Sequence, residues 1–247
     1  MHFNLDDSFE FFGGTVDARY LLSTFSGDDN FDWTQGWNGR GQFWVALQKG
    51  DDGDKGIEAD NNTNNRDLEP RSNPTIYNVT LIGAPTTTDG SNSDRGVMLR
   101  EGTAAKLYNV IVTGFKNVGV EIDHSATFAQ AQNGNLIFNN SLFFGNGAVG
   151  NRGNFSKDAS ETPAPPFTTE NHLTVRMDRN READPLLRSP YSLLSPDFRP
   201  ALESPARNLH YVRTTPDDGF FTRVDFIGGV DPLSDWTQMG WTTFSPN

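Results

Sequence analysis

Acidic side chains recur at equivalent places in three similar segments near the start of the chain. Glu10, Asp32 and Glu58 each lie between two apolar residues, in "FEF", "FDW" and "IEA". If these segments are neighbouring parallel strands, their carboxylates stack about 4.8 Å apart and repel one another unless a proton or a cation intervenes. Calcium takes about six to eight oxygen ligands and suits such a surface. The sequence therefore predicts a Ca²⁺ site, with ligands drawn from Asp28, Asp29, Asp32, Glu58 and Asp60.

Two other interpretations of this acidic column stay open. It can be a solvated ladder of charge balanced by Lys55 and Arg100, because runs of charge are usually solvated faces. It can also be a glycosidase pair, with Asp32 and Glu58 as acid and nucleophile, because retaining enzymes hold two carboxyl groups about 5 to 5.5 Å apart. Any acidic ladder meets that distance. The sequence has no nucleophile elbow, P-loop or zinc-spaced histidine pair, which favours a protein that is not an enzyme.

Aromatic and basic residues follow the acidic stretch and provide candidates for ligand binding. Trp33 lies in an apolar column and is expected in the core, whereas Trp37 and Trp44 are candidates for stacking on sugar rings. Packing under a loop is the alternative for both. Arg40 is a third candidate, since a polysaccharide lyase needs a basic residue near bound Ca²⁺.

The elements that would position these residues follow from a repeated alternation of apolar and polar residues. The middle residues of five aligned segments follow one another after 22, 26, 40 and 23 residues, and the shorter steps suit one coil of a parallel β-solenoid. Alternation predicts two inward columns with one outward column between them. The inward columns are Phe9, Phe31, Ile57, Val97, Val120 and Phe11, Trp33, Ala59, Leu99, Ile122; the outward one is Glu10, Asp32, Glu58, Met98, Glu121.

A second strand is predicted in each coil, in "RYLLSTF", "QFWVALQ", "IYNVTLIG", "LYNVIVTG" and "IFNNSLFF". Asn140 interrupts its apolar column, either as a stacked buried amide or because the alignment is shifted there. A β-sandwich would not place similar residues in register over five segments, so the pattern favours an all-β, right-handed parallel β-helix. The inward candidates of these strands are Tyr20/Leu22, Val45/Leu47, Val79/Leu81, Val110/Val112 and Asn140/Leu142.

The repeat fades after about residue 145, and prolines become frequent. We expect residues 1–147 to form the coils of the helix. We expect residues 148–247 to form an irregular final coil and a Pro-rich C-terminal segment of the same domain. Such a segment would pack over an end or flank of the helix and cover open strand edges.

Composition restricts the class of protein. The chain has 247 residues, a net charge of -12 and no cysteine. This charge argues against a nucleic-acid partner and favours cation binding. The sequence has no apolar run of the roughly 20 residues that a membrane span needs, and no disulfide can form.

Several stretches resemble a widespread family of bacterial exported right-handed parallel β-helix repeat proteins of the pectate-lyase-like type. They include "DDSFEFFGGTV", "GDDNFDWTQGWNGRGQFW", "GDKGIEADNN", "DRGVMLREGTA" and the ending "VDFIGGVDPLSDWTQMGWTTF". The resemblance implies the fold and an extracellular or cell-surface location. Members usually carry a leader and further coils before "DDSFEFFGG". No leader is visible at Met1, so we expect that upstream coils or a leader are missing from this chain.

The sequence thus predicts a non-enzymatic extracellular structural or adhesion protein. Because an uncapped solenoid end presents unpaired strand edges, the chain could stack end to end into a surface filament. The alternative is a module that binds or degrades polysaccharide. The predicted partners are other copies of the chain, through the solenoid ends, or surface glycans, and Ca²⁺ is the one predicted cofactor.

Overall fold

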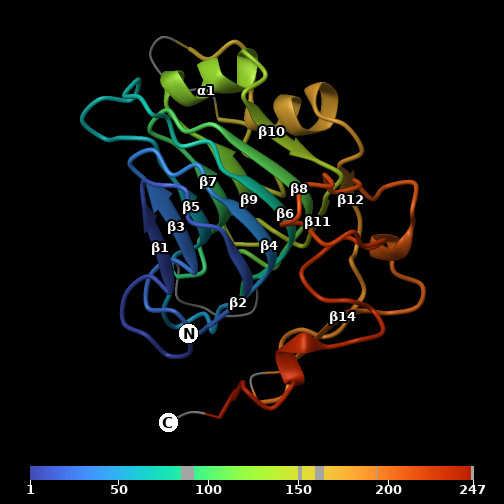
Figure 1. The fold of residues 1–247 in the computed structure, drawn as a ribbon. Helices are drawn as coiled ribbons and strands as arrows, with labels where there is room; N and C mark the ends of the chain where they lie inside the picture. Colours follow the sequence, from blue (N-terminus) through green and yellow to red (C-terminus); the bar gives the residue numbers. More distant parts are fainter. Residues whose placement is uncertain (85–91, 150–151, 159–163, 193, 246–247) are drawn as a thin grey trace.

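The computed structural model describes residues 1–84, 92–149, 152–158, 164–192 and 194–245. From Phe9 to Asn139, successive strands alternate between two β-sheets whose strands all pair in parallel (Figure 1). Within the described ranges, no helix is long and apolar enough to cross a lipid bilayer. The first sheet has the order β1 (Phe9–Phe12), β3 (Phe31–Thr34), β5 (Lys55–Ala59), β7 (Arg95–Leu99) and β9 (Val118–Ile122).

The second sheet contains the alternate strands of the chain, and β10 (Leu136–Asn139) also pairs with its β8. Its order is β12 (Arg181–Glu182), β11 (Leu142–Phe144), β8 (Ala105–Thr113), β6 (Thr75–Ile82), β4 (Arg40–Leu47) and β2 (Ala18–Thr24). The remaining elements are α1 (Ser125–Gln132), α2 (Thr169–Asn171), the π-helix η1 (His172–Arg176), the antiparallel pair β13 (Leu187–Ser189) and β14 (Asp197–Pro200), and the 3₁₀ turns η2 (Pro205–Arg207) and η3 (Trp236–Gln238).

The register of the first sheet confirms the predicted columns. Phe9 pairs with Phe31, Phe31 with Ile57, and the same column continues through Val97 to Val120. The inward side chains from β3 onwards are buried and form one hydrophobic core. Alternation therefore places the intervening residues on the outer face, and the acidic column lies there as predicted.

The second sheet differs from the prediction at three of its strands. Val79/Leu81 and Val110/Val112 lie in the core as expected, but Trp44 and Ala46 occupy the places predicted for Val45 and Leu47. Leu22 and Leu142 also face outward, and Tyr20 is exposed. The cause is a residue with positive φ inside each repeat, which places two successive side chains on the outer face and shifts the alternation. These residues are Tyr20, Phe43, Asn78, Asn109 and Asn140.

The asparagines of this column bind the C-terminal segment to the outer face of the second sheet. Asn78 donates its amide to the carbonyl of Phe226 at 2.9 Å. Asn109 donates to the carbonyl of Arg213 and accepts from its N–H, both at 2.8 Å. Asn140 is a buried amide and donates to Tyr211 at 2.9 Å. Asparagine tolerates the left-handed backbone, and its amide supplies the partners that a passing chain needs.

Apolar residues complete this contact. Val45, Leu47 and Ile82 of the second sheet pack against Phe198, Phe226 and other residues of the C-terminal segment. This segment is drawn in orange and red beside β4, β6 and β8 in Figure 1. A Cβ on Gly229 would lie 2.3 Å from the carbonyl oxygen of Trp44, so only glycine permits this approach of the two backbones. Strands β4, β6 and β8 therefore bury apolar residues on both faces of the sheet.

Candidate functional site

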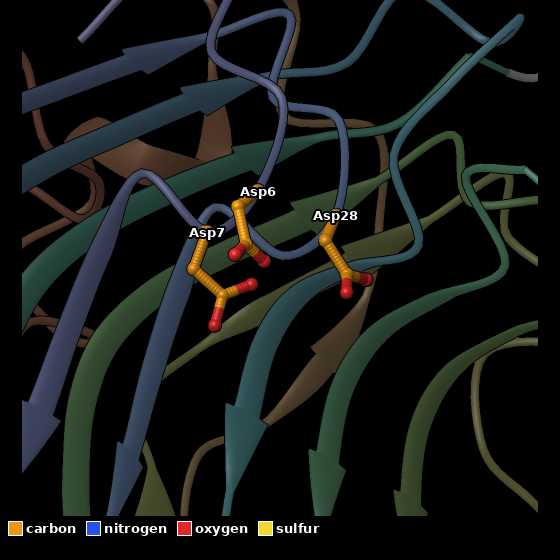
Figure 2. A group of neighbouring side chains, drawn as sticks. All are labelled: Asp6, Asp7 and Asp28. Atoms are coloured by element: carbon orange, nitrogen blue, oxygen red, sulfur yellow. The ribbon is translucent and has the colours of Figure 1, made fainter.

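The candidate site is the acidic column on the outer face of β1, β3 and β5 and the turns before these strands. The sheet register places Glu10 beside Asp32 and Asp32 beside Glu58. Figure 2 shows Asp6, Asp7 and Asp28 at one end of the column, in the turns that precede β1 and β3. One carboxylate oxygen from each of these three residues lies within 4.8 Å of the others. Acidic groups thus continue from the turns onto the strands.

Asp29, Asp32 and Glu58 form the buried centre of this column. All three side chains are buried, and one oxygen from each lies within 4.8 Å of the others. Asp32 is 9% exposed, and its Oδ1 has no hydrogen-bond partner within the described part of the chain. A buried carboxylate oxygen without a donor is costly, because it loses its water and gains nothing in return.

This burial changes the pKa values of the Asp29 and Asp32 carboxyl groups. Loss of water raises the pKa of Asp29 to about 9 and that of Asp32 to about 8. For Asp32 the neighbouring carboxylate of Glu58 acts in the same direction, whereas Lys55 opposes the shift at Asp29. Near neutral pH, the cation-free site therefore retains protons that a bound cation would displace.

In the described part of the chain, Lys55 and Arg100 lie on the Glu58 side of the column, and Lys55 also reaches Asp29 of the buried centre. Lys55 lies 2.8 Å from Glu58 and 3.8 Å from Asp29, measured between Nζ and the carboxylate oxygens. Arg100 pairs with Glu58 and, at 2.9 Å, with Asp60. These are the counter-charges expected for a solvated ladder, but they do not reach the unpartnered oxygen of Asp32. The Glu58 side is thus an ion-pair network, and the opposite end keeps its excess of negative charge.

The structure brings together four of the five predicted calcium ligands. Asp28, Asp29, Asp32 and Glu58 all belong to groups of neighbouring carboxylates, whereas Asp60 is held by Arg100. Four further residues of these groups were not among the ligands predicted from the sequence. The repeat of "LDDSFEF" in "GDDNFDW" was the available signal, since the first acid pair precedes β1 as the second precedes β3. The additional residues are Asp6, Asp7, Glu10 and Asp54.

The predicted catalytic pair has neighbouring carboxylates but little access. Oxygens of Asp32 and Glu58 lie within 4.8 Å of each other, close to the separation of a retaining glycosidase. Both residues are 9% exposed, and Glu58 is engaged by Lys55 and Arg100. A sugar ring must reach the reacting carboxylates directly, and this burial opposes such contact.

Trp37 and Trp44 are not at the surface, so the expectation that they are exposed to a glycan is wrong. Both are 0% exposed and belong to the main core. Trp37 stacks on Phe11, with ring centroids 4.2 Å apart, and Trp44 contacts Phe31 at 4.8 Å. Each indole N–H donates to a backbone carbonyl, that of Val16 or that of Ala18. The shift of the alternation in β4 turns Trp44 inward.

Arg40 links the start of β4 to two other parts of the chain. Its guanidinium contacts Asp17 and, at 2.9 Å, Asp218 of the C-terminal segment. It also lies over the ring of Phe220, 4.7 Å from the centroid. These contacts occupy the guanidinium in a structural connection, and the two tryptophans named with it as ligand candidates lie in the core.

Comparison with known proteins gives a family match. Residues 1–179 match a family model described as a pectate-lyase-like beta helix domain. No curated protein matches the chain, and no solved structure does. The match includes every residue of the acidic column and ends before β12.

Proposed function

Since the chain belongs to the family of pectate-lyase-like beta helix domains, we propose that it is an extracellular, non-enzymatic adhesion and structural module that binds Ca²⁺ on its acidic face. The family fits a polysaccharide-related or structural role. We further propose that the protein lies outside the cell and that its β-helix is right-handed. A bound cation would be part of the folded protein.

One observation carries the calcium proposal. The Oδ1 atom of Asp32 is buried beside the carboxylates of Asp29 and Glu58 and has no hydrogen-bond partner among the described residues. A cation would supply the missing partner and at the same time neutralise the charges that now repel one another. The donors are carboxylate oxygens, which hard cations prefer.

The choice of calcium over magnesium rests on the shape of the acidic column. Calcium accepts irregular sets of oxygens at varied angles, whereas magnesium requires a near-octahedral arrangement and keeps most of its water. Here the oxygens come from three turns and three strands, with several overlapping groups in place of one compact cage. Asp28 at the margin would add to the shell around the buried centre, whereas the neighbouring Asp54 is paired with Lys55.

Calcium is expected to raise the melting temperature of the protein and EDTA to lower it. A ligand that binds only the folded state stabilises it by about 2.7 kcal/mol at a hundred times its Kd. Thermal unfolding followed by circular dichroism in CaCl₂, MgCl₂ and EDTA at one ionic strength checks this. Equal melting temperatures in CaCl₂ and EDTA would contradict the proposal, and equal effects of both cations would indicate simple charge screening.

Degradation of polysaccharide is the second candidate function. It is favoured by the proximity of Asp32, with its raised pKa, to a carboxylate held by Lys55 and Arg100. This is the arrangement of an acid beside a charged group that glycosidases use. Release of new sugar ends from polysaccharides, lost in both Asp32→Asn and Glu58→Gln, would support the enzyme and replace the adhesion proposal.

Self-association is the structural form of the adhesion proposal. Within the described residues, β1 pairs with β3 alone, and β2 pairs with β4 and, at Thr24, with His2. Phe12 at this edge is 61% exposed. Open strand edges with exposed apolar residues favour edge-to-edge association. Light scattering is expected to show concentration-dependent assembly that Phe12→Lys reduces; a monomer at every concentration would remove self-association from the proposal.

A further inference from the structure

A cavity of about 480 Å³ lies between the C-terminal segment and the outer face of β2 and β4. Its lining includes Tyr20, Trp236, Trp241, Asp231 and Ser234. We propose that this cavity is a binding site for a neutral polysaccharide. It is a different site from the acidic column, which lies on the first sheet, and it needs residues beyond the part of the chain that matches the family.

The aromatic rings form a rigid platform. Trp236 is 8% exposed and donates its indole N–H to the carbonyl of Gly229 at 2.7 Å. Trp241 lies nearly parallel to it, with centroids 5.9 Å apart and an angle of 11° between the rings. Tyr20 meets Trp236 edge to face at 5.4 Å and stacks on Phe43 at 5.1 Å. The buried ring thus fixes the orientation of the outer ones.

The outer rings are open to solvent. Trp241 is 60% exposed and Tyr20 is 45% exposed, although both are large and partly apolar. Side chains of this kind gathered at one exposed site mark a place of interaction. The apolar C–H face of a pyranose ring is flat and of similar size to an indole, so it can cover Trp241 while its hydroxyl groups remain at the rim.

Polar groups at the rim fit those hydroxyl groups. Asp231 accepts a hydrogen bond from the N–H of Leu233 through Oδ1, and in the described chain its Oδ2 has no protein donor. Ser234 is exposed beside it and offers both a donor and an acceptor. In ligand sites of this kind, a few polar groups around an aromatic surface orient the small molecule that binds there.

Charge restricts the kind of sugar. Asp231 is the charged residue of the lining, and the whole chain carries a net charge of -12. An acidic glycan would bring carboxylates to a carboxylate without a basic partner in the lining. A neutral hexose polymer avoids this repulsion and keeps the stacking and the hydrogen bonds.

Calorimetric titration with neutral oligosaccharides derived from cellulose, mannan and starch tests the site. Oligogalacturonate serves as the acidic comparison, and all titrations are run in EDTA so that loss of cation binding cannot explain a failure. At least one neutral oligosaccharide is expected to bind saturably, and Trp241→Ala is expected to weaken it about tenfold or more. Asp231→Asn should weaken it less, and Phe144→Ala, which removes an exposed ring elsewhere, should leave it unchanged.

The melting temperature of Trp241→Ala should stay close to that of the unaltered chain, because the ring is mostly exposed. Absence of binding to every neutral oligosaccharide would overturn the proposal, and so would equal affinity of the unaltered chain and Trp241→Ala. Binding of oligogalacturonate alone would also overturn it. A tryptophan-rich peptide that binds where no sugar does would assign the cavity to a protein partner instead.

Discussion

In EDTA at pH 8, Asp32→Asn is expected to stabilise the protein against unfolding, although it removes a wild-type carboxylate. Burial raises the pKa of Asp32 to about 8, so the folded state holds a proton that the unfolded chain has already released. Stability from this proton is complete below the unfolded pKa of about 4 and is lost as the pH rises through about 8. The loss is on the order of a few kcal/mol. The amide of Asp32→Asn carries no charge, so the variant does not lose this stability as the pH rises.

The pH profile of unfolding checks this sign. In EDTA, the free energy of unfolding of the unaltered chain should fall between about pH 5 and pH 9, and the fall should be smaller in Asp32→Asn, where Asp29 still titrates. In saturating Ca²⁺ the order should reverse, because the unaltered chain gains the ligand and the variant does not. Asp178→Asn, which removes an exposed charge far from the column, should follow the unaltered chain in both conditions. A profile that rises with pH in EDTA would show that these carboxylates ionise freely.

Trp44→Ala is expected to destabilise the protein by about 3–5 kcal/mol, the usual cost of removing a large aromatic side chain from a core. Trp44 is 0% exposed, contacts Phe31 and Trp37, and donates to the carbonyl of Ala18. The substitution leaves a cavity and an unpaired carbonyl in the same place. Chemical denaturation measures the effect, with Trp241→Ala as the matched exposed tryptophan.

A decrease in the free energy of unfolding of less than about 1 kcal/mol in Trp44→Ala would contradict the inward orientation of the Trp44 side chain. It would indicate that Trp44 lies at the surface, as a candidate for sugar contact does. A large loss in Trp44→Ala with little change in Trp241→Ala would instead separate the core tryptophan from the exposed one.

The first sheet could be predicted residue by residue, and the second could not. Strands β1 to β9 of the first sheet follow a strict alternation, so one aligned residue in each fixes all the others. In the second sheet, Phe43 and Asn109 occupy left-handed positions, and the alternation starts anew after them. Phenylalanine rarely adopts a left-handed backbone, so the residue type at position 43 does not predict the shift. Val45 and Leu47 are apolar because the C-terminal segment covers them, which a repeat pattern does not reveal.

Of the two proposed sites, the acidic column could likewise be predicted from the sequence, and the aromatic cavity could not. The acidic column arises from residues of one kind at one place in successive coils, so the repeat itself points to it. The aromatic cavity joins Tyr20 to Trp236 and Trp241, which are more than 200 residues away along the chain and follow no period. Only the path of the C-terminal segment over the second sheet, held by Asn78 and Asn109, brings them together.

Calorimetric titration of the protein with Ca²⁺ after removal of bound cations tests the central claim most directly. We predict saturable binding with a Kd at or below about 10⁻³ M, as for extracellular calcium modules, accompanied by proton release near pH 7. Asp32→Asn should abolish the binding and Asp178→Asn should preserve it, because only Asp32 lies in the acidic column. No saturable heat up to several times that concentration, or equal binding by both variants, would contradict a calcium site at Asp29, Asp32 and Glu58.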